Sequence, residues 1–374
     1  MKVLIFGNAR SIFIRDYIRF VLNDPHIEIT LFDHGSVTQD FYDFYRQRGV
    51  HLIHVPLIGR IPKIRALWYK YRLRRAVKSY GPYDVIHIHY VGSERLRYAM
   101  SAIRPETRLV VSFWGSDIYR QNLNHLLRLR KYLNVCTVIT LATKRMLRTF
   151  RDVYGEQYEQ KIRPVLFGIS TLETIDETRK ILNKQRIKEQ LGIDPGSLVV
   201  SVGYSRSEAQ QHDKVLEVLS GMPETQLKKI TFLLPLTYGN CSADYEGKLL
   251  ALLDNIPSEK LLVRGFQTTE QIARLRLATD IYINAQTTDA FSASVQEYLY
   301  AGALLLNPVW LKYDELNDWN AYYQEYQQFS DLPNLIEKVI QNGLPDLQNN
   351  ASIIMSKTSW EAVRQGWLDI YKSP

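Results

Sequence analysis

Cysteine is scarce in this sequence, and long apolar runs are missing. The two cysteines, Cys136 and Cys241, lie far apart, with no CxxC spacing and no cluster of cysteine and histidine. We therefore expect neither a disulfide framework nor a structural zinc site, as suits a reducing cytosol. No apolar run approaches the roughly 18–20 residues that span a bilayer. The opening MKVLIFGNAR leads into a charged amphipathic stretch, which predicts a buried first strand and not a secretory signal.

The length of the chain and its apolar pattern indicate two α/β domains. A chain of 374 residues is too long for one ordinary core. Apolar residues make up 45% and charged residues 23%, so neither a fibre nor a disordered chain is indicated. Short β-rich runs alternate with helical patterns in both halves, which predicts parallel βαβ units and doubly wound sheets. The predicted divisions are a first Rossmann-like domain (1–168), a second (169–355) and a C-terminal helix (356–374) that packs back on the body.

The expected elements follow from this alternation. Strands are predicted at Lys2–Phe6, Ile27–Phe32, His51–Val55, Val85–Ile88, Arg108–Phe113, Val138–Leu141, Leu198–Val202, Ile230–Leu234, Leu261–Val263, Ile281–Asn284 and Leu304–Leu306. Helices are predicted at Ser11–Leu22, Lys144–Tyr154, around Lys214–Leu219 and at Ser359–Tyr371. Thr174–Leu191 is expected to be one charged helix with Thr174 as its N-cap. We expect Arg163–Gly168 to be a loop.

The segment Arg60–Lys78 contains eight lysine and arginine residues and no acidic residue, within a chain of net charge +8. Apolar side chains such as Leu67, Trp68 and Tyr71 interleave with these bases. A basic amphipathic helix of this kind suits an anionic membrane surface. The alternative is a solvated basic face whose apolar side packs on the domain core. A nucleic-acid partner is not expected, because no nucleic-acid-binding motif accompanies the charge.

The most specific motif is the stretch Ala285–Gly302, which follows an apolar strand and leads into a helix. Free N–H groups and the dipole at such a helix start favour a diphosphate. Glu297, about one turn further on, can accept hydrogen bonds from two ribose hydroxyls, and Asp289 can contact a sugar ring. The alternative is a helix N-cap followed by an incidental glutamate. The small residues at the helix start are Ser292, Ala293 and Ser294.

Two other segments also follow strands. In Ser201–His212, Gly203 permits a tight turn, and Ser205 with the following amides can form an anion-binding nest. The alternative for His212 is an ordinary polar residue at a helix start. In Val110–Tyr119, Asp117 is a candidate base for an acceptor hydroxyl, or else a helix N-cap.

These segments resemble known families. Ala285–Gly302 resembles the E-x7-E region of the glycogen-synthase-like superfamily of GT-B glycosyltransferases, with Asp289 in place of the first Glu. Ser201–His212 and the Trp-Gly-Ser-Asp of Trp114–Asp117 are similar to segments of bacterial 4-acetamido-4,6-dideoxygalactose (Fuc4NAc) transferases. The resemblance implies two Rossmann-like domains that face a central cleft, the first for the acceptor and the second for a nucleotide-sugar donor. It leaves retention or inversion open.

The predicted site follows from these motifs and from the resemblance. Catalytic roles fall to Asp117 and Asp289. Donor binding is assigned to Gly203, Ser205, His212, Arg264, Ser292, Ala293, Ser294 and Glu297. The acceptor side comprises Gly7, Asn8, Trp114 and Ser116. His87 and His89 alternate along a strand, so they should face one side of the sheet in a structural role.

The predicted function is sugar transfer from a nucleotide-sugar to a lipid-linked glycan in cell-surface polysaccharide assembly, on the cytoplasmic face of the membrane. No metal is expected, because a D-x-D motif is missing, and no cofactor is expected besides the donor. A nucleotide-sugar epimerase or dehydrogenase is disfavoured, because Gly7-Asn-Ala-Arg10 lacks the G-x-G-x-x-G pattern. The other alternative is a membrane-docked, non-catalytic scaffold, suggested by Ala290 and Ser292 where related enzymes have glycines.

Overall fold

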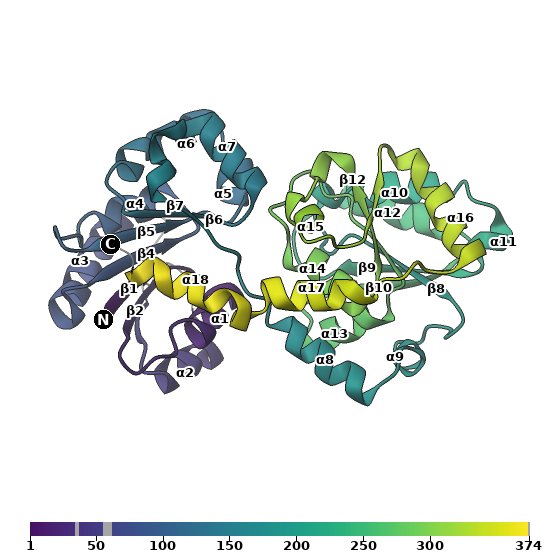
Figure 1. The fold of residues 1–374 in the computed structure, drawn as a ribbon, viewed down its shortest axis with the longest axis horizontal. Coiled ribbons are helices and arrows are strands. Elements are labelled where there is room, and N and C mark those ends of the chain that lie inside the picture. The colour runs from purple at the N-terminus through teal and green to yellow at the C-terminus, as the bar shows by residue number, and fades with distance from the viewer. Residues whose placement is uncertain (34–36, 55–61, 373–374) are drawn as a thin grey trace. The chain divides into compact units, whose positions relative to one another are not determined.

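Two parallel sheets, each with helices on both faces, make up the chain (Figure 1). The computed structural model describes residues 1–33, 37–54 and 62–372. One unit comprises Met1–Gly168 and Trp360–Pro374, and the other comprises Ile169–Ser359. The sequence predicts that the second domain ends at residue 355, whereas in the structure the second unit ends at Ser359.

The first sheet has seven strands in the order β3-β2-β1-β4-β5-β6-β7. Its strands are β1 (Lys2–Phe6), β2 (Glu28–Asp33), β3 (His51–His54), β4 (Val85–His89), β5 (Arg108–Ser112), β6 (Val138–Leu141) and β7 (Ile162–Pro164). The helices of this unit are α1 (Ile12–Phe20), α2 (Gln39–Gln47), α3 (Pro62–Tyr80), α4 (Ser93–Ala99), α5 (Ser116–Tyr119), α6 (Leu123–Leu133), α7 (Lys144–Tyr154) and α18 (Trp360–Lys372). Arg163–Gly168 was expected to be a loop, but it begins inside β7, a strand too short to show alternation.

Helix α18 returns to the first unit and lies beside α1 (Figure 1). Its buried face carries Trp360 and Trp367, which join the core formed by one face of the first sheet. The Tyr17 ring of α1 lies 5.0 Å from the Trp367 ring, edge to face. The last helix of the chain therefore packs into the same core as the first strand.

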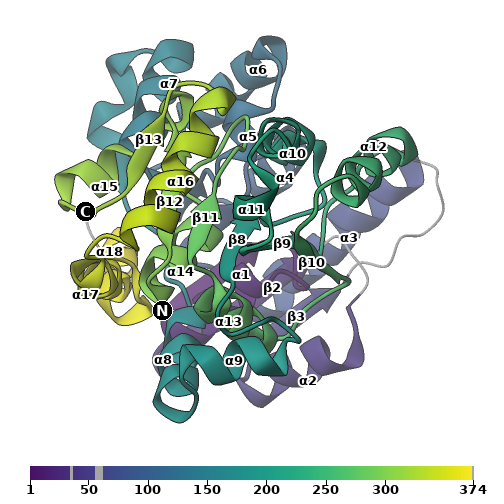
Figure 2. The ribbon, with the colours of Figure 1, turned by 90° about the vertical axis from the view of Figure 1, so that its right-hand side faces the viewer.

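The second sheet has six strands in the order β10-β9-β8-β11-β12-β13. Its strands are β8 (Leu198–Val202), β9 (Ile230–Leu236), β10 (Glu259–Arg264), β11 (Ile281–Ile283), β12 (Leu304–Pro308) and β13 (Gln324–Tyr326). Its helices are α8 (Thr171–Ile181), α9 (Lys184–Gln190), α10 (His212–Leu219), α11 (Glu224–Leu227), α12 (Ala243–Asp254), α13 (Thr269–Ala278), α14 (Ala293–Ala301), α15 (Asp314–Asp318), α16 (Leu332–Asn342) and α17 (Gln348–Thr358). Helices α10, α12 and α16 cover one face, and α8, α9 and α13 cover the other (Figure 2).

The single helix predicted at Thr174–Leu191 is wrong, because the structure has two helices there, α8 and α9. Helix α8 begins at Thr171, so Thr174 is not its N-cap. The chain is extended at Leu182, and the Asn183 side chain then accepts the N–H of Arg186 at 2.9 Å. Asparagine is a strong N-cap, and here it starts a new helix.

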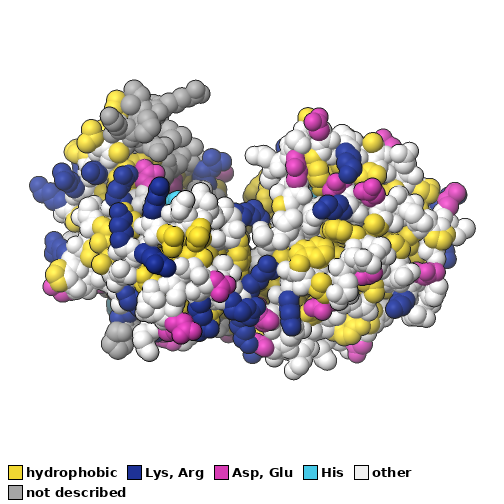
Figure 3. Space-filling model, turned by 90° about the horizontal axis from the view of Figure 1, so that it is seen from above, with side chains coloured by type: hydrophobic (Ala, Val, Ile, Leu, Met, Phe, Trp, Pro, Cys, Tyr) yellow, Lys and Arg dark blue, Asp and Glu magenta, His cyan; other side chains and the backbone are white. Residues whose placement is uncertain are grey.

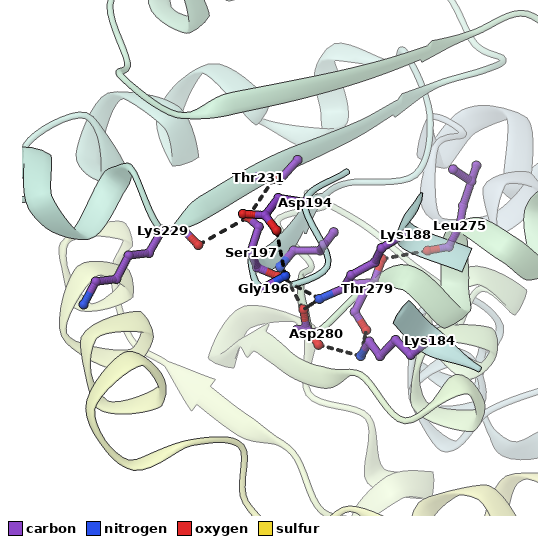
Figure 4. Close-up of polar contacts among 11 residues, drawn as sticks. Lys184, Lys188, Asp194, Gly196, Ser197, Lys229, Thr231, Leu275, Thr279 and Asp280 are labelled. Carbon is purple, nitrogen blue, oxygen red and sulfur yellow. Dashed lines mark hydrogen bonds and ion pairs between the residues drawn. The ribbon is translucent and has the colours of Figure 1, made fainter. Parts of the chain in front are cut away.

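A partly buried ionic cluster holds α9 at the amino-terminal edge of the second sheet (Figure 4). The Asp280 carboxylate lies 2.5 Å from Lys184 Nζ and 2.9 Å from Lys188 Nζ. It also accepts the backbone N–H of Val199 at 2.8 Å. One carboxylate therefore joins α9 to the starts of β8 and β11.

Both strand orders reverse near their centres, between β1 and β4 in the first sheet and between β8 and β11 in the second. Ligands of open α/β sheets bind beyond the carboxyl ends of the strands at such switch points. The loops at these positions begin at Gly7 and Tyr90 in the first unit, and at Gly203 and Asn284 in the second. Six of the predicted site residues lie in these loops, namely Gly7, Asn8, Gly203, Ser205, Asp289 and Ser292.

Candidate functional site

The loop after β8 begins with a glycine that no other residue can replace without strain. Gly203 has φ +66°, in the left-handed region that favours glycine. A Cβ atom at this position would lie 2.7 Å from His212 Nε2 and 3.0 Å from Gln210 Oε1. The missing side chain therefore lets the imidazole pack directly against the turn.

His212 is the first residue of α10 and is 0% exposed. Its Nδ1 lies 3.1 Å from the Tyr245 hydroxyl, whereas Nε2 has no hydrogen-bond partner among the described residues. Burial lowers the pKa of the imidazole to about 4, so the ring is neutral at pH 7. In the tautomer that accepts the Tyr245 proton at Nδ1, Nε2 carries the ring hydrogen. An unused donor then lies against Gly203 at the switch point.

The loops after β8 and β11 are bound to each other. The Thr287 N–H donates to the Ala209 carbonyl at 2.9 Å, and the Gln211 side chain donates to the Ala285 carbonyl at 2.7 Å. The hydroxyl of Ser205 is buried and accepts from the Gln210 side chain at 3.2 Å. The structure thus brings Gly203, Ser205 and His212 into one loop system with the start of α14.

Asp289 organises the turn before α14. Its Oδ2 accepts the N–H of Ser292 at 2.9 Å and the Tyr313 hydroxyl at 2.5 Å. Burial raises the pKa of the Asp289 carboxyl, while the bonds from Tyr313 and Ser292 oppose this shift. Phe291, between these residues, has φ +66°. Asp289 thus holds a strained turn, and its Oδ2 is already occupied by two donors.

Helix α14 begins at Ala293 after Ser292, which makes no side-chain capping bond. Glu297 is 6% exposed, and its Oε2 accepts from Arg276 Nε at 3.0 Å. Arg276 also donates to the Ser294 hydroxyl at 3.1 Å. Sequence reasoning missed Arg276, which is buried near the end of α13 together with Leu275 and Leu277.

Asp117 is 1% exposed, and neighbouring backbone N–H groups bind both of its oxygens. Oδ2 accepts from Val91 at 2.7 Å, and Oδ1 accepts from Trp114 at 2.8 Å and Gly115 at 2.9 Å. Burial raises the pKa of the carboxyl to about 6 against these bonds. The N-cap of α5 is Gly115, so Asp117 is not the cap either. In this geometry the aspartate joins the loops after β4 and β5 and is not an accessible base.

The remaining acceptor-side residues lie around the first switch point. Gly7 leaves room for Ile14, whose Cδ1 would lie 2.9 Å from a Cβ at this position. Asn8 is exposed and accepts the N–H of Arg10 through its side chain at 3.0 Å. The Trp114 ring is half-buried, and Ser116 Oγ lies 3.3 Å from the Tyr90 hydroxyl.

Arg264 lies at the end of the edge strand β10, away from the switch point. It pairs with Glu246 of α12, which also lies 3.9 Å from Arg206 in the loop after β8. Glu246 therefore connects the end of β10 to the loop after β8, which contains Gly203 and Ser205.

His87 and His89 face the same side of β4, as predicted, with ring centroids 3.8 Å apart. His87 lies 2.7 Å from the Tyr371 hydroxyl and 2.6 Å from Ser112 Oγ. Burial lowers the pKa of both rings, that of His89 to about 3. Within residues 1–33, 37–54 and 62–372, no group of three or more histidine, cysteine or acidic residues could hold a metal ion.

Residues 2–147 match the family described as glycosyl transferase 4-like. No curated protein matches the sequence of the chain. HepE of Anabaena, solved with UDP-glucose, is 15% identical over 100% of both chains with a TM-score of 0.74. A glycosyltransferase from Rickettsia africae is 14% identical over 99% of this chain and 97% of its own, with a TM-score of 0.76. WaaG, a glycosyltransferase involved in lipopolysaccharide biosynthesis, is 15% identical over 100% of both chains with a TM-score of 0.65.

These similarities confirm the predicted fold class. The chain has the GT-B fold, with parallel sheets of seven and six strands in two α/β units. At such low identity the solved structures establish the fold alone. The specific similarity to Fuc4NAc transferases and the E-x7-E assignment stay predictions.

Proposed function

We propose that the chain is a glycosyltransferase that uses a nucleoside-diphosphate sugar as donor. The observation that supports this most directly is the unpartnered Nε2 of His212, buried against Gly203 at the switch point of the second sheet. A buried polar nitrogen without a partner is costly unless a ligand or water satisfies it. The family match over residues 2–147 and the UDP-glucose bound to HepE agree with this assignment.

The chemistry requires stabilisation of negative charge on the leaving diphosphate. As the bond between the anomeric carbon and the diphosphate breaks, that charge grows, and preorganised N–H donors stabilise it. In the tautomer whose Nε2 carries the ring hydrogen, His212 is such a donor, and so are the first amides of α14. The N–H groups of Tyr204 and Arg206 in the loop after Gly203 already donate to Gln210 Oε1 and to the Tyr238 carbonyl. The acceptor hydroxyl then forms the new glycosidic bond and loses its proton. Because the oxygens of Asp117 are occupied, we do not assign that proton to this residue.

For the acceptor, we propose a lipid-linked glycan at the cytoplasmic membrane surface. One face of α3 packs inward through Tyr69, Leu73 and Ala76. Ile64, Leu67 and Tyr71 lie exposed on the same helix. The exposed bases beside them are Lys70, Arg74, Arg75 and Lys78. Arg60 and the side chains of Lys63 and Arg65 lie outside the described residues.

An exposed apolar and basic stripe matches an anionic interface. Lysine and arginine side chains are spread over much of the first unit's surface in the view of Figure 3. In the described part of the chain, none of the helices has the length and apolar character that a membrane span requires. The role of WaaG in lipopolysaccharide biosynthesis agrees with a cell-surface pathway.

A second candidate, a non-catalytic scaffold, is favoured by one observation. Two of the predicted site carboxylates, Asp117 and Glu297, are engaged by groups within the protein. Donor binding and donor hydrolysis separate the two functions.

The test is thermal unfolding with UDP, GDP and dTDP, followed by hydrolysis assays with the corresponding sugar donors. A nucleotide at 100 times its Kd stabilises the folded state by about 2.7 kcal/mol. We expect one of the three nucleotides to raise the Tm. We also expect the corresponding sugar donor to be hydrolysed slowly, with release of that nucleoside diphosphate. His212→Gln should lower the affinity for that nucleotide about tenfold or more, as expected when a hydrogen bond to a charged group is lost. The matched control is His125→Gln, at a half-buried position of α6 in the first unit. No Tm shift and no hydrolysis across the panel would favour the scaffold.

A further inference from the structure

A buried arginine of α13 reaches the predicted ribose-binding carboxylate on α14. Arg276 and Glu297 are 5% and 6% exposed, and their ion pair measures 3.0 Å between Nε and Oε2. The second arm of the guanidinium donates to Ser294 Oγ at 3.1 Å. One side chain therefore contacts two of the residues predicted to bind the donor.

The position of Arg276 is fixed from another side as well. Its Cζ lies 4.1 Å from the centroid of the Tyr298 ring. That ring stacks on Tyr282 of β11 at 4.0 Å, and its hydroxyl lies 2.6 Å from Ser201 Oγ of β8. The guanidinium is thus tied to both strands that flank the switch point.

This arrangement determines what Glu297 can offer to a ligand. A buried carboxylate is costly to keep charged without a cation, and Arg276 supplies that cation. Because Oε2 is bound to Arg276, the side chain is held in one orientation. An ionised carboxylate only accepts hydrogen bonds, so Oε1 is available to a hydroxyl donor.

We propose that Arg276 is a positioning residue for the donor ribose: it holds Glu297 charged and oriented so that Oε1 accepts a hydrogen bond from a ribose hydroxyl. The inference rests on the proposed function and adds a residue to the same site. Arg276 itself is 5% exposed, and its proposed role acts through Glu297.

Another arginine of the same unit provides a matched control. Arg179 of α8 lies 4.8 Å from the centroid of the Tyr300 ring of α14 and donates to the Tyr300 carbonyl at 2.9 Å. It therefore makes an arginine–tyrosine contact with the same helix without pairing with Glu297. Loss of a general packing contact on α14 should affect both arginine variants, whereas loss of ribose positioning should affect only Arg276.

The experiment measures calorimetric affinities of UDP, GDP and their 2′-deoxy forms for four variants and the wild type. We expect the wild type to prefer the ribose form by about tenfold, the value of one hydrogen bond to a charged group. Arg276→Met should bring the ratio close to one and leave the affinity for the deoxy form nearly unchanged. Arg276→Lys should restore part of the preference, and Arg179→Met should keep it. Arg276→Met leaves the Glu297 carboxylate without its cation and can fail to fold for that reason. The double variant Arg276→Met/Glu297→Gln removes this charge imbalance, and it should also show a ratio of affinities close to one.

Three outcomes overturn the inference. If Arg276→Met or the double variant still prefers the ribose form over the 2′-deoxy form about tenfold, the Arg276–Glu297 pair does not bind the ribose hydroxyl. Equal affinities in the wild type refute the ribose contact but leave the proposed function intact. No binding of any nucleotide by the folded wild type defeats the proposed function and the inference with it.

Discussion

Acid should destabilise the second unit through His212. This ring is 0% exposed, and burial lowers its pKa to about 4. In the unfolded chain the imidazole has its ordinary pKa of about 6.5. Between these two values the unfolded chain binds a proton that the folded protein does not bind, so the free energy of unfolding falls as the pH falls. Because of the gap between the two pKa values, the free energy of unfolding falls by about 3 kcal/mol by the time the pH reaches 4.

The measurement compares wild type with His212→Gln in denaturant-induced unfolding at pH 7, 6, 5 and 4. The wild type should lose about 3 kcal/mol more than the variant over this range. His87 and His89 of the first unit have pKa values lowered in the same direction, and the comparison of the two proteins cancels their contribution. NMR of labelled histidines gives the pKa of each ring directly.

Two results would refute this reasoning. The first is a His212 ring that titrates near 6.5 in the folded protein, which would mean that water reaches it. The second is a pair of parallel stability curves, which would show that the proton on this ring does not affect folding. A bound nucleoside diphosphate should raise the pKa of the ring, because negative charge favours the protonated imidazole.

Two other predictions concern the turn at Gly203 and the surface of α3. Gly203→Ala should lower the Tm of the second unit, because a side chain at φ +66° costs about 1–2 kcal/mol and its Cβ would meet His212 at 2.7 Å. An unchanged Tm in calorimetry would contradict this. Replacement of Lys70, Arg74 and Arg75 by Glu should release the protein from anionic vesicles, since each base near such a surface contributes about 1 kcal/mol. Neutral vesicles are the control, and undiminished binding to anionic vesicles would refute membrane docking. Arg72 is left unchanged because it donates to the His54 carbonyl.

The alternation of strands and helices was readable from the sequence, because each element records its own burial in its apolar pattern. Strands such as β1 and β8 begin and end where they were predicted. The edge strands β7 and β13, of three residues each, are too short to show a period. The break between α8 and α9 depends on one capping residue, Asn183, inside a stretch whose charge pattern suits a continuous helix.

The sequence by itself determined the two α/β halves, the glycine turn at Gly203 and the group of polar residues that follows β11. Only the tertiary structure decided the partners of those residues. Arg276 meets Glu297 because α13 packs against α14, and Asp117 binds Val91 because β4 and β5 are neighbours in the sheet. Local periodicity reports which face of an element is buried. It does not report which element packs against that face, and that choice determines the charge and hydrogen bonding of each site residue.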